Sequence, residues 1–151
     1  DAYQAKMDKL EAQSISNTTG SSGNGVLSSG MSFPLTCNCY VSQHYGHNGH
    51  KGVDIAGANI NGQPVYAAAG GTVISASYHS SWGNNVLIEH GNGVWTRYAH
   101  LSSIGVSAGQ TVSQGQYIGK VGSTGNSSGP HLHFEVYVNK NRVNPEPYIG
   151  L

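Results

Sequence analysis

From residue 33 onward the chain is built of short apolar runs separated by glycine, asparagine and serine, a spacing that suits strands and excludes long helices. The sequence contains 22 glycines, and because apolar runs lie between them, frequent turns explain this content better than disorder does. We therefore expect an all-β domain whose antiparallel sheets fold over one another. The expected strands cover residues 72–77, 86–90, 94–99, 111–112, 117–121 and 131–138. Gly91-Asn92-Gly93 predicts a β-hairpin, because Asn and Gly tolerate positive φ.

Residues 1–31 differ in composition from the rest. The first twelve, DAYQAKMDKLEA, place apolar side chains at helical spacing among good helix formers, which predicts a short helix. That helix is either the end of a longer coiled coil, which we favour, or an element that docks on the domain. Residues 14–30 are rich in Ser, Gly and Asn, which is typical of a flexible linker. We divide the chain into a helical stub with linker at 1–31 and a folded domain at 32–151.

Charged residues are few, with seven Lys and Arg and seven Asp and Glu. This balance leaves no basic surface for a phosphate backbone, so we expect no nucleic-acid partner. No apolar segment approaches the length of a membrane span, and we expect none in this chain. The eight histidines outnumber each charged residue type, which directs attention to metal binding and proton transfer.

Cys37 and Cys39 allow a local disulfide, a thiolate metal pair or free thiols. Thiolate zinc sites usually use Cys-x2-Cys spacing and a second such pair, and neither is present. We favour the disulfide, with free thiols next, and expect so small a ring to stabilise the fold only weakly.

The segment GPHLHFEVYV places two histidines one residue apart in a predicted strand. Since side chains alternate between the faces of a strand, His131, His133 and Glu135 lie on one face and the apolar residues between them lie on the other. The polar face is then an exposed surface or the wall of a cleft. Both imidazoles can reach one metal there, or one can bind it while its neighbour handles a proton.

Two further motifs contribute to the same chemistry. GHKGVDI contains His50 and Asp54 four residues apart, and YAHL places His100 at the end of the predicted hairpin. Together with His133, His50 and Asp54 would supply two nitrogens and one oxygen, a set suited to a catalytic zinc with a fourth position for water. A structural zinc more often has four protein ligands, commonly including cysteines, and no such set can be assembled here.

The other histidines are expected to lie outside the site. His44 and His47 occupy a loop rich in Gly and Asn, His79 lies at a loop tip, and His90 ends a strand at a turn.

The motifs GHKGVDI, YAHL and GPHLHFEV, in this order, resemble the lysostaphin-type zinc endopeptidases of family M23, which cut peptidoglycan peptides. The resemblance extends over residues 33–148 and includes PVYAAAGGTV and GNNVLIEHGNG. It implies a zinc-dependent peptidoglycan hydrolase, located outside the cell or in the cell envelope.

The resemblance also implies roles for five residues. His50, Asp54 and His133 would hold one zinc ion per chain, and His100 and His131 would act on the water and the transition state. Zinc lowers the pKa of its bound water, a neutral imidazole can accept the proton, and a donor imidazole can stabilise the oxyanion. Either of the two catalytic histidines can take either role.

Five residues are candidates for lining the substrate groove, with ordinary core or loop packing as the alternative for each: Tyr45, Tyr78, Trp82, Asn84 and Tyr98. Glu135 is a candidate for orienting the catalytic imidazoles. The chain departs from the family in its short YGHNGHKG loop, where Asn48 stands near a position at which many members carry arginine.

Three other interpretations compete with the enzyme. A non-catalytic relative of the same fold would regulate wall enzymes, and a binding module would hold the wall without cutting it. A lipoyl or biotinyl carrier would need a modifiable lysine at an exposed turn, whereas Lys120 lies within a predicted strand.

Overall fold

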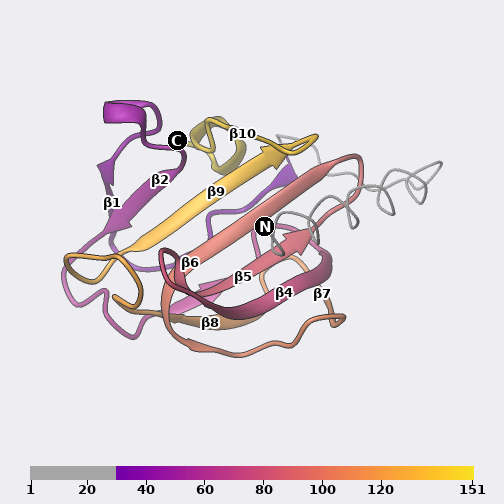
Figure 1. The fold of residues 1–151 in the computed structure, drawn as a ribbon, viewed down its shortest axis with the longest axis horizontal. Helices are drawn as coiled ribbons and strands as arrows, with labels where there is room; N and C mark the ends of the chain where they lie inside the picture. Colours follow the sequence, from indigo (N-terminus) through magenta and orange to yellow (C-terminus); the bar gives the residue numbers. More distant parts are fainter. Residues whose placement is uncertain (1–29) are drawn as a thin grey trace.

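The computed structural model describes residues 30–151, so the predicted helix and nearly all of the predicted linker lie outside the described residues. The described part of the chain forms a ten-stranded sheet in which every strand pair is antiparallel (Figure 1). This confirms the predicted all-β class. The strands are β1 (Tyr40–Gln43), β2 (Val53–Ala56), β3 (Pro64–Tyr66), β4 (Gly71–His79), β5 (Gly83–Glu89), β6 (Val94–Ile104), β7 (Thr111–Val112), β8 (Tyr117–Val121), β9 (Leu132–Val138) and β10 (Asn141–Val143). Two 3-10 turns lie at His47–Gly49 and Glu146–Ile149.

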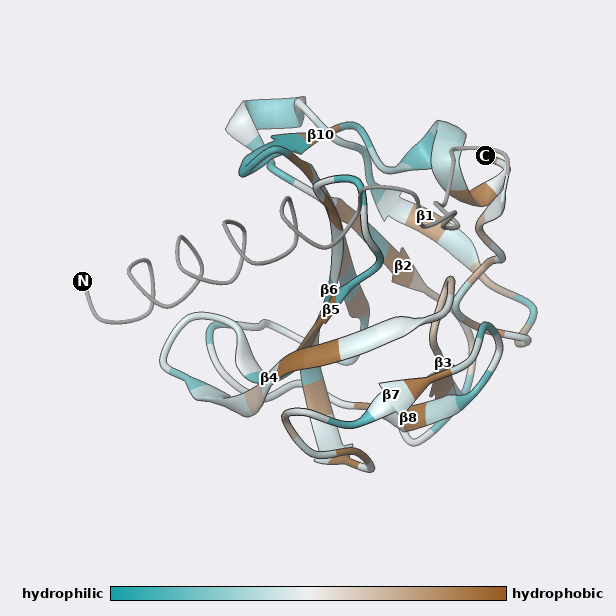
Figure 2. Ribbon diagram, turned by 90° about the vertical axis from the view of Figure 1, so that its right-hand side faces the viewer, coloured by the Kyte–Doolittle hydropathy of each residue, from teal (hydrophilic) through white to brown (hydrophobic). Residues whose placement is uncertain are grey.

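Strand β6 connects the two parts of the sheet. The strand order is β1-β2-β9-β6-β5-β4-β7, with β10 on β9 and with β8 pairing both β6 and β3. The first part of β6 pairs with β5 and β9, whereas its end, from Leu101 to Ile104, pairs with β8. The sheet therefore folds back on itself, with β3 and β8 side by side (Figure 2). One apolar cluster, which includes Val65, Ile118 and Phe134, joins these strands to the main sheet.

The β5–β6 hairpin forms where the sequence predicts it. Gly91, Asn92 and Gly93 have φ values of 94°, 55° and 77°, and these three residues make the turn. The His90 N–H donates to the Val94 carbonyl at 2.9 Å and closes the end of the ladder. The turn chemistry thus fixes the register of the two central strands.

Strand β9 has the alternation that the sequence predicts. Leu132, Phe134 and Val136 are fully buried in the apolar core. The strand begins at Leu132, one residue later than expected, and His131 joins the sheet through an isolated bridge to Gly122. The opposite face carries His133 and Glu135, which are also largely buried.

Cys37 and Cys39 form a disulfide, the arrangement that the sequence favours.

Among residues 30–151 no helix has the length and apolar character that crossing a membrane requires.

Candidate metal centre and cleft

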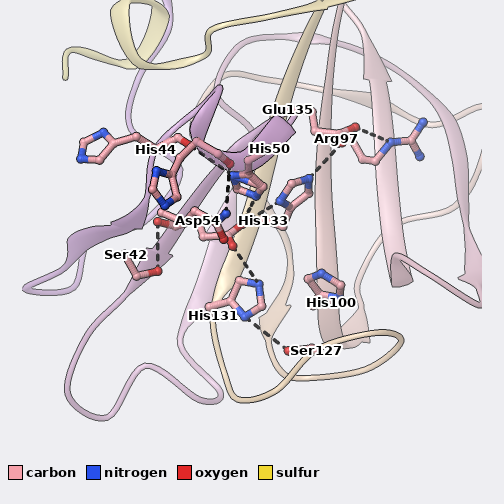
Figure 3. A network of polar contacts seen from close by, with 12 residues as sticks. Ser42, His44, His50, Asp54, Arg97, His100, Ser127, His131, His133 and Glu135 are labelled. Atoms are coloured by element: carbon pink, nitrogen blue, oxygen red, sulfur yellow. Dashed lines mark hydrogen bonds and ion pairs between the residues drawn. The ribbon is translucent and has the colours of Figure 1, made fainter.

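Asp54 is the residue on which the predicted metal ligands converge. The pairing of β2 with β9 places it directly opposite His133, whose Nδ1 lies 2.7 Å from Asp54 Oδ1. His50 Nε2 lies 3.2 Å from the same oxygen, and His131 Nε2 lies 3.7 Å from Asp54 Oδ2. Three imidazoles from two separate motifs therefore face one carboxylate (Figure 3).

His100 reaches this group because β6 contains a bulge. The register between β5 and β6 shifts by one residue between Tyr98 and Leu101. Strict alternation would turn His100 toward the core, but its backbone has a left-handed φ of 64° within the shifted segment. Its ring consequently lies with its centroid 4.8 Å from that of His131 and 5.9 Å from that of His133.

Backbone carbonyls set the tautomers of the two predicted catalytic histidines. His100 Nδ1–H donates to the Thr124 carbonyl at 2.7 Å, and His131 Nδ1–H donates to the Gly129 carbonyl at 2.9 Å. Since a carbonyl only accepts, each neutral ring keeps its hydrogen on Nδ1 and has Nε2 as an acceptor. Both side chains line the cleft, so each ring can exchange a proton there. Glu135, which we expected to orient these rings, contacts His133 instead.

His133 lies between two carboxylates. Its Nδ1 is 2.7 Å from Asp54 Oδ1, and its Nε2 is 2.9 Å from Glu135 Oε2. Burial alone would lower the pKa of His133, but the hydrogen bonds to Asp54 and Glu135 raise it to about 9. Because both partners only accept, the position between Nδ1 and Asp54 requires either a proton or another cation.

The residues around that position suit a zinc ion. The candidate ligand atoms of His50, Asp54 and His133 all lie within 4.8 Å of one another. When a metal replaces the Nδ1 proton of His133, the Nε2–H bond to Glu135 can remain. Two imidazole nitrogens and one carboxylate oxygen form a donor set that Zn²⁺ binds in catalytic sites.

The protonation states also favour a metal. Burial would raise the pKa of Asp54, but its hydrogen bond with His133 and the charges of the surrounding imidazoles together lower it. Burial lowers the pKa of His50 and of His100. The carboxylate is thus ionised and these imidazoles are neutral, the forms needed for metal ligation and for accepting a proton.

The histidines line an open cleft of about 480 Å³. Its walls also include eight residues that were not predicted from the sequence: Gln43, Gly49, Lys51, Ser81, Asn126, Ser127, Ser128 and Arg142. Lys51 follows His50 directly, and Ser127 and Ser128 lie just before His131, so their positions beside the motifs could have indicated them. Arg142 lies on β10, and no motif marks it.

Of the five predicted substrate-binding residues, Trp82 alone lines the cleft. Tyr78 is 63% exposed but lies outside the lining set. The Asn84 amide donates to the Leu101 carbonyl at 3.1 Å, and the Tyr45 hydroxyl donates to the Arg142 carbonyl at 3.2 Å. Both of these side chains hold neighbouring backbone segments together.

Tyr98 lies in the core, which corrects the expectation that it lines the groove. It is fully buried, and its hydroxyl accepts the Ala68 N–H at 2.9 Å and lies 2.7 Å from Thr96 Oγ1. Its ring packs edge-on against Phe134. The alternation along β6 places Tyr98 on the face opposite Arg97, and this face points into the core.

The four histidines expected outside the site do not join the metal cluster. His44 is exposed, with Nδ1 2.8 Å from Glu146 Oε2, and His47 lies in a 3-10 turn. The centroid of the His79 ring lies 4.8 Å from the centroid of the Trp82 ring. His90 is at the hairpin, as expected, but is only 7% exposed.

Comparison with known proteins identifies close relatives of this arrangement. The family model described as Peptidase family M23 matches residues 48–145. The peptidoglycan DD-endopeptidase ShyA of Vibrio cholerae serotype O1 is 48% identical over 95 residues, which cover 63% of this chain and 22% of ShyA. The chain thus spans about a fifth of the length of the curated relatives it matches.

Solved structures share the fold. A zinc-containing peptidase from Vibrio cholerae superposes with a TM-score of 0.69 at 36% identity, covering 77% of this chain and 39% of that one. Lysostaphin from Staphylococcus simulans superposes with a TM-score of 0.71 at 34% identity, covering 80% of this chain and 53% of lysostaphin.

Proposed function

Because this chain belongs to peptidase family M23, we propose that it is a zinc-dependent endopeptidase that cleaves cross-links or stem peptides of bacterial peptidoglycan. The peptidoglycan DD-endopeptidase and the zinc-containing peptidase among its relatives support this proposal. The observation that carries it is the convergence of His50, Asp54 and His133 beside two further histidines in an open cleft.

In this proposal His50 Nε2, His133 Nδ1 and a carboxylate oxygen of Asp54 hold one zinc ion per chain. The short distances from both nitrogens to Asp54 Oδ1 support the assignment. When bound, zinc supplies a Lewis acid that acidifies a water molecule and polarises the scissile carbonyl.

His100 and His131 divide the proton chemistry. Each has Nδ1 fixed by a backbone carbonyl, so its Nε2 serves the cleft. A neutral ring accepts the proton of the attacking water at Nε2, and a protonated ring donates from Nε2 to the oxygen that becomes negative in the transition state. The proton taken from the water then passes from the ring to the nitrogen of the leaving amine.

The peptide substrate lies along the open cleft. Trp82 offers an aromatic wall, and Lys51 and Arg142 bring positive charge to the lining. An extended peptide in such a groove is held by backbone hydrogen bonds and a few side-chain contacts. Since peptidoglycan is the substrate in this proposal, the protein acts outside the cell or in the cell envelope, with residues 32–151 as the catalytic unit and residues 1–31 as a tether.

Neither the regulatory relative nor the wall-binding module accounts for this site as well. A relative that has lost catalysis would be expected to lack ligands, whereas all five predicted positions are occupied by ligating or titratable residues that meet in one place. Clearing of a suspension of purified peptidoglycan, measured with zinc and with a chelator, tests the proposal. Zinc-dependent clearing supports it, and no clearing with zinc bound contradicts it.

A further inference from the structure

Glu135 is a buried carboxylate, and both of its oxygens accept hydrogen bonds. It is 1% exposed and lies two residues after His133 on β9. Its Oε2 accepts His133 Nε2–H at 2.9 Å, and its Oε1 accepts the Tyr137 hydroxyl at 2.6 Å and Arg97 Nε–H at 3.1 Å. Oε2 also accepts Arg142 Nη1–H at 3.4 Å, so Tyr137 and Arg97 hold Oε1 while His133 and Arg142 share Oε2.

Two cations compensate this charge: Arg97, which is fully buried in β6, and Arg142 on β10, whose side chain is 37% exposed. Arg97 also donates from Nη1–H to Asn85 Oδ1 at 2.7 Å. Its guanidinium carbon lies 3.6 Å from the centroid of the Trp82 ring, which lines the cleft. The plane and direction of the guanidinium are thus set on several sides.

A buried ion pair is seldom retained for stability alone, because desolvating both charges offsets most of their attraction. Here Glu135, one member of the pair, accepts a hydrogen bond from the ring of His133, a candidate zinc ligand. We propose that Arg97 and Glu135 are positioning residues that hold His133 with its hydrogen on Nε2 and its Nδ1 toward the metal. The inference rests on the proposed zinc site, since it concerns how one of its ligands is oriented.

The substitution Glu135→Gln tests this proposal, because the hydrogen-bond donors that surround the side chain decide which way the glutamine amide points. Arg97 and Tyr137 both donate to the position of Oε1 and are buried, whereas Arg142 at the position of Oε2 is partly exposed and can turn toward solvent. The amide oxygen of glutamine therefore turns toward Arg97 and Tyr137, and its NH₂ group faces His133 Nε2. His133 Nε2 must then accept, so the ring loses its Nε2 hydrogen and keeps the one on Nδ1, the atom proposed to bind zinc. We expect the zinc affinity of the metal-free protein to fall about 10–100-fold.

The affinity is measured by competition with a chelator, and the hydrogens on the two His133 ring nitrogens by long-range ¹H–¹⁵N NMR on the metal-free protein. The wild type should carry both hydrogens, and Glu135→Gln should carry only the one on Nδ1. Glu89→Gln is the control, because it makes the same chemical change in a carboxylate at the far end of β5 that accepts the Gly91 N–H. We expect the control to bind zinc as the wild type does. A His133 ring that keeps its Nε2 hydrogen and a zinc affinity that is unchanged in Glu135→Gln would together overturn the inference.

Arg97→Lys provides a second test if Glu135→Gln does not fold. Lysine keeps the charge but cannot hold Glu135 and Asn85 at once, so zinc affinity should fall about fivefold. An unchanged zinc affinity in Arg97→Lys would contradict the positioning role of Arg97 and Glu135. If the wild-type protein itself binds no zinc, the zinc site is wrong, and this result is distinct from failure of the positioning role.

Discussion

Asp54 and His133 are 79 residues apart in the sequence and are direct partners in the β2–β9 pairing, with Oδ1 and Nδ1 2.7 Å apart. Side chains alternate along both strands, so a register slip of one residue would turn one of the two away from the other. The candidate metal centre therefore depends on the same register that buries Phe134 opposite Val53.

Replacing Asp54 with Asn should remove most of the bound zinc. The amide is close in size to the carboxylate but lacks the charge that faces the imidazoles of His50 and His133. We expect zinc content after dialysis to fall from about one ion per chain toward zero, and the extra stability that zinc confers on the wild type to be lost with it. Metal analysis and thermal unfolding with and without zinc measure both. A full zinc content in Asp54→Asn would contradict the ligand assignment.

His100→Ala and His131→Ala should each retain zinc and lose turnover. Their Nδ1 atoms donate to backbone carbonyls, so removing either ring takes away a proton carrier and no proposed ligand. We expect kcat to fall about 10²–10⁴-fold at an unchanged zinc content.

Steady-state kinetics on a cross-linked muropeptide and metal analysis of the same samples check this prediction. If His131→Ala emptied the metal site, the division between ligands and proton carriers would be wrong.

Periodicity and turn chemistry predicted much of the fold. The hairpin at Gly91-Asn92-Gly93 and the alternation in β9 follow from local rules, because positive φ favours Asn and Gly and strand side chains alternate. The short strands β1, β2, β3 and β10 were missed, since three or four residues carry too little pattern to identify a strand.

The sequence could not show how His100 reaches the site. Alternation from Tyr98 gives the wrong face, and only the bulge with its left-handed backbone corrects it. The burial of Tyr98 was missed for a related reason, because eight consecutive residues of β6 are buried and polarity does not separate its two faces. Arg97 and Glu135 form an ion pair although they are 38 residues apart in the sequence, and no local motif predicts this contact.

Trp82→Ala should weaken substrate binding. Trp82 is the one predicted groove residue that lines the cleft, so its loss removes an aromatic wall. We expect KM for a peptidoglycan peptide to rise about tenfold.

Two aromatic controls accompany that measurement. Tyr78→Ala removes an exposed ring outside the cleft lining and should leave KM unchanged. Tyr98→Phe should also leave KM unchanged but lower the free energy of unfolding by about 1–2 kcal/mol, because Ala68 N–H loses its acceptor. An equal rise of KM in Trp82→Ala and Tyr78→Ala would contradict the placement of the groove.

Acid should destabilise the fold through His90. Its Nδ1–H donates to the Gly70 carbonyl and its Nε2 accepts from Thr96 Oγ1, an arrangement that holds the ring neutral. Burial lowers the pKa of His90 from 6.5 to about 4, so between these pH values the unfolded chain binds a proton that the folded protein does not. The free energy of unfolding should therefore be fully maintained above pH 6.5 and fall by about 3 kcal/mol as the pH drops to 4.

Urea unfolding at several pH values, in the presence of a chelator, measures this loss without interference from metal binding. His90→Gln keeps a donor and an acceptor but does not titrate, so its stability should depend less on pH by the same amount. A pH dependence equal to that of the wild type would show that His90 is not the responsible group.

The most direct test of the central proposal is digestion of purified peptidoglycans of several bridge types, followed by mass analysis of the released fragments. We predict that the zinc-loaded protein releases fragments with a new amino and a new carboxyl terminus at one kind of peptide bond. The chelated protein and zinc-loaded His131→Ala should release none. If zinc-loaded wild-type protein released no peptide fragment from any of these substrates, the endopeptidase proposal would be contradicted and a binding or regulatory role would replace it.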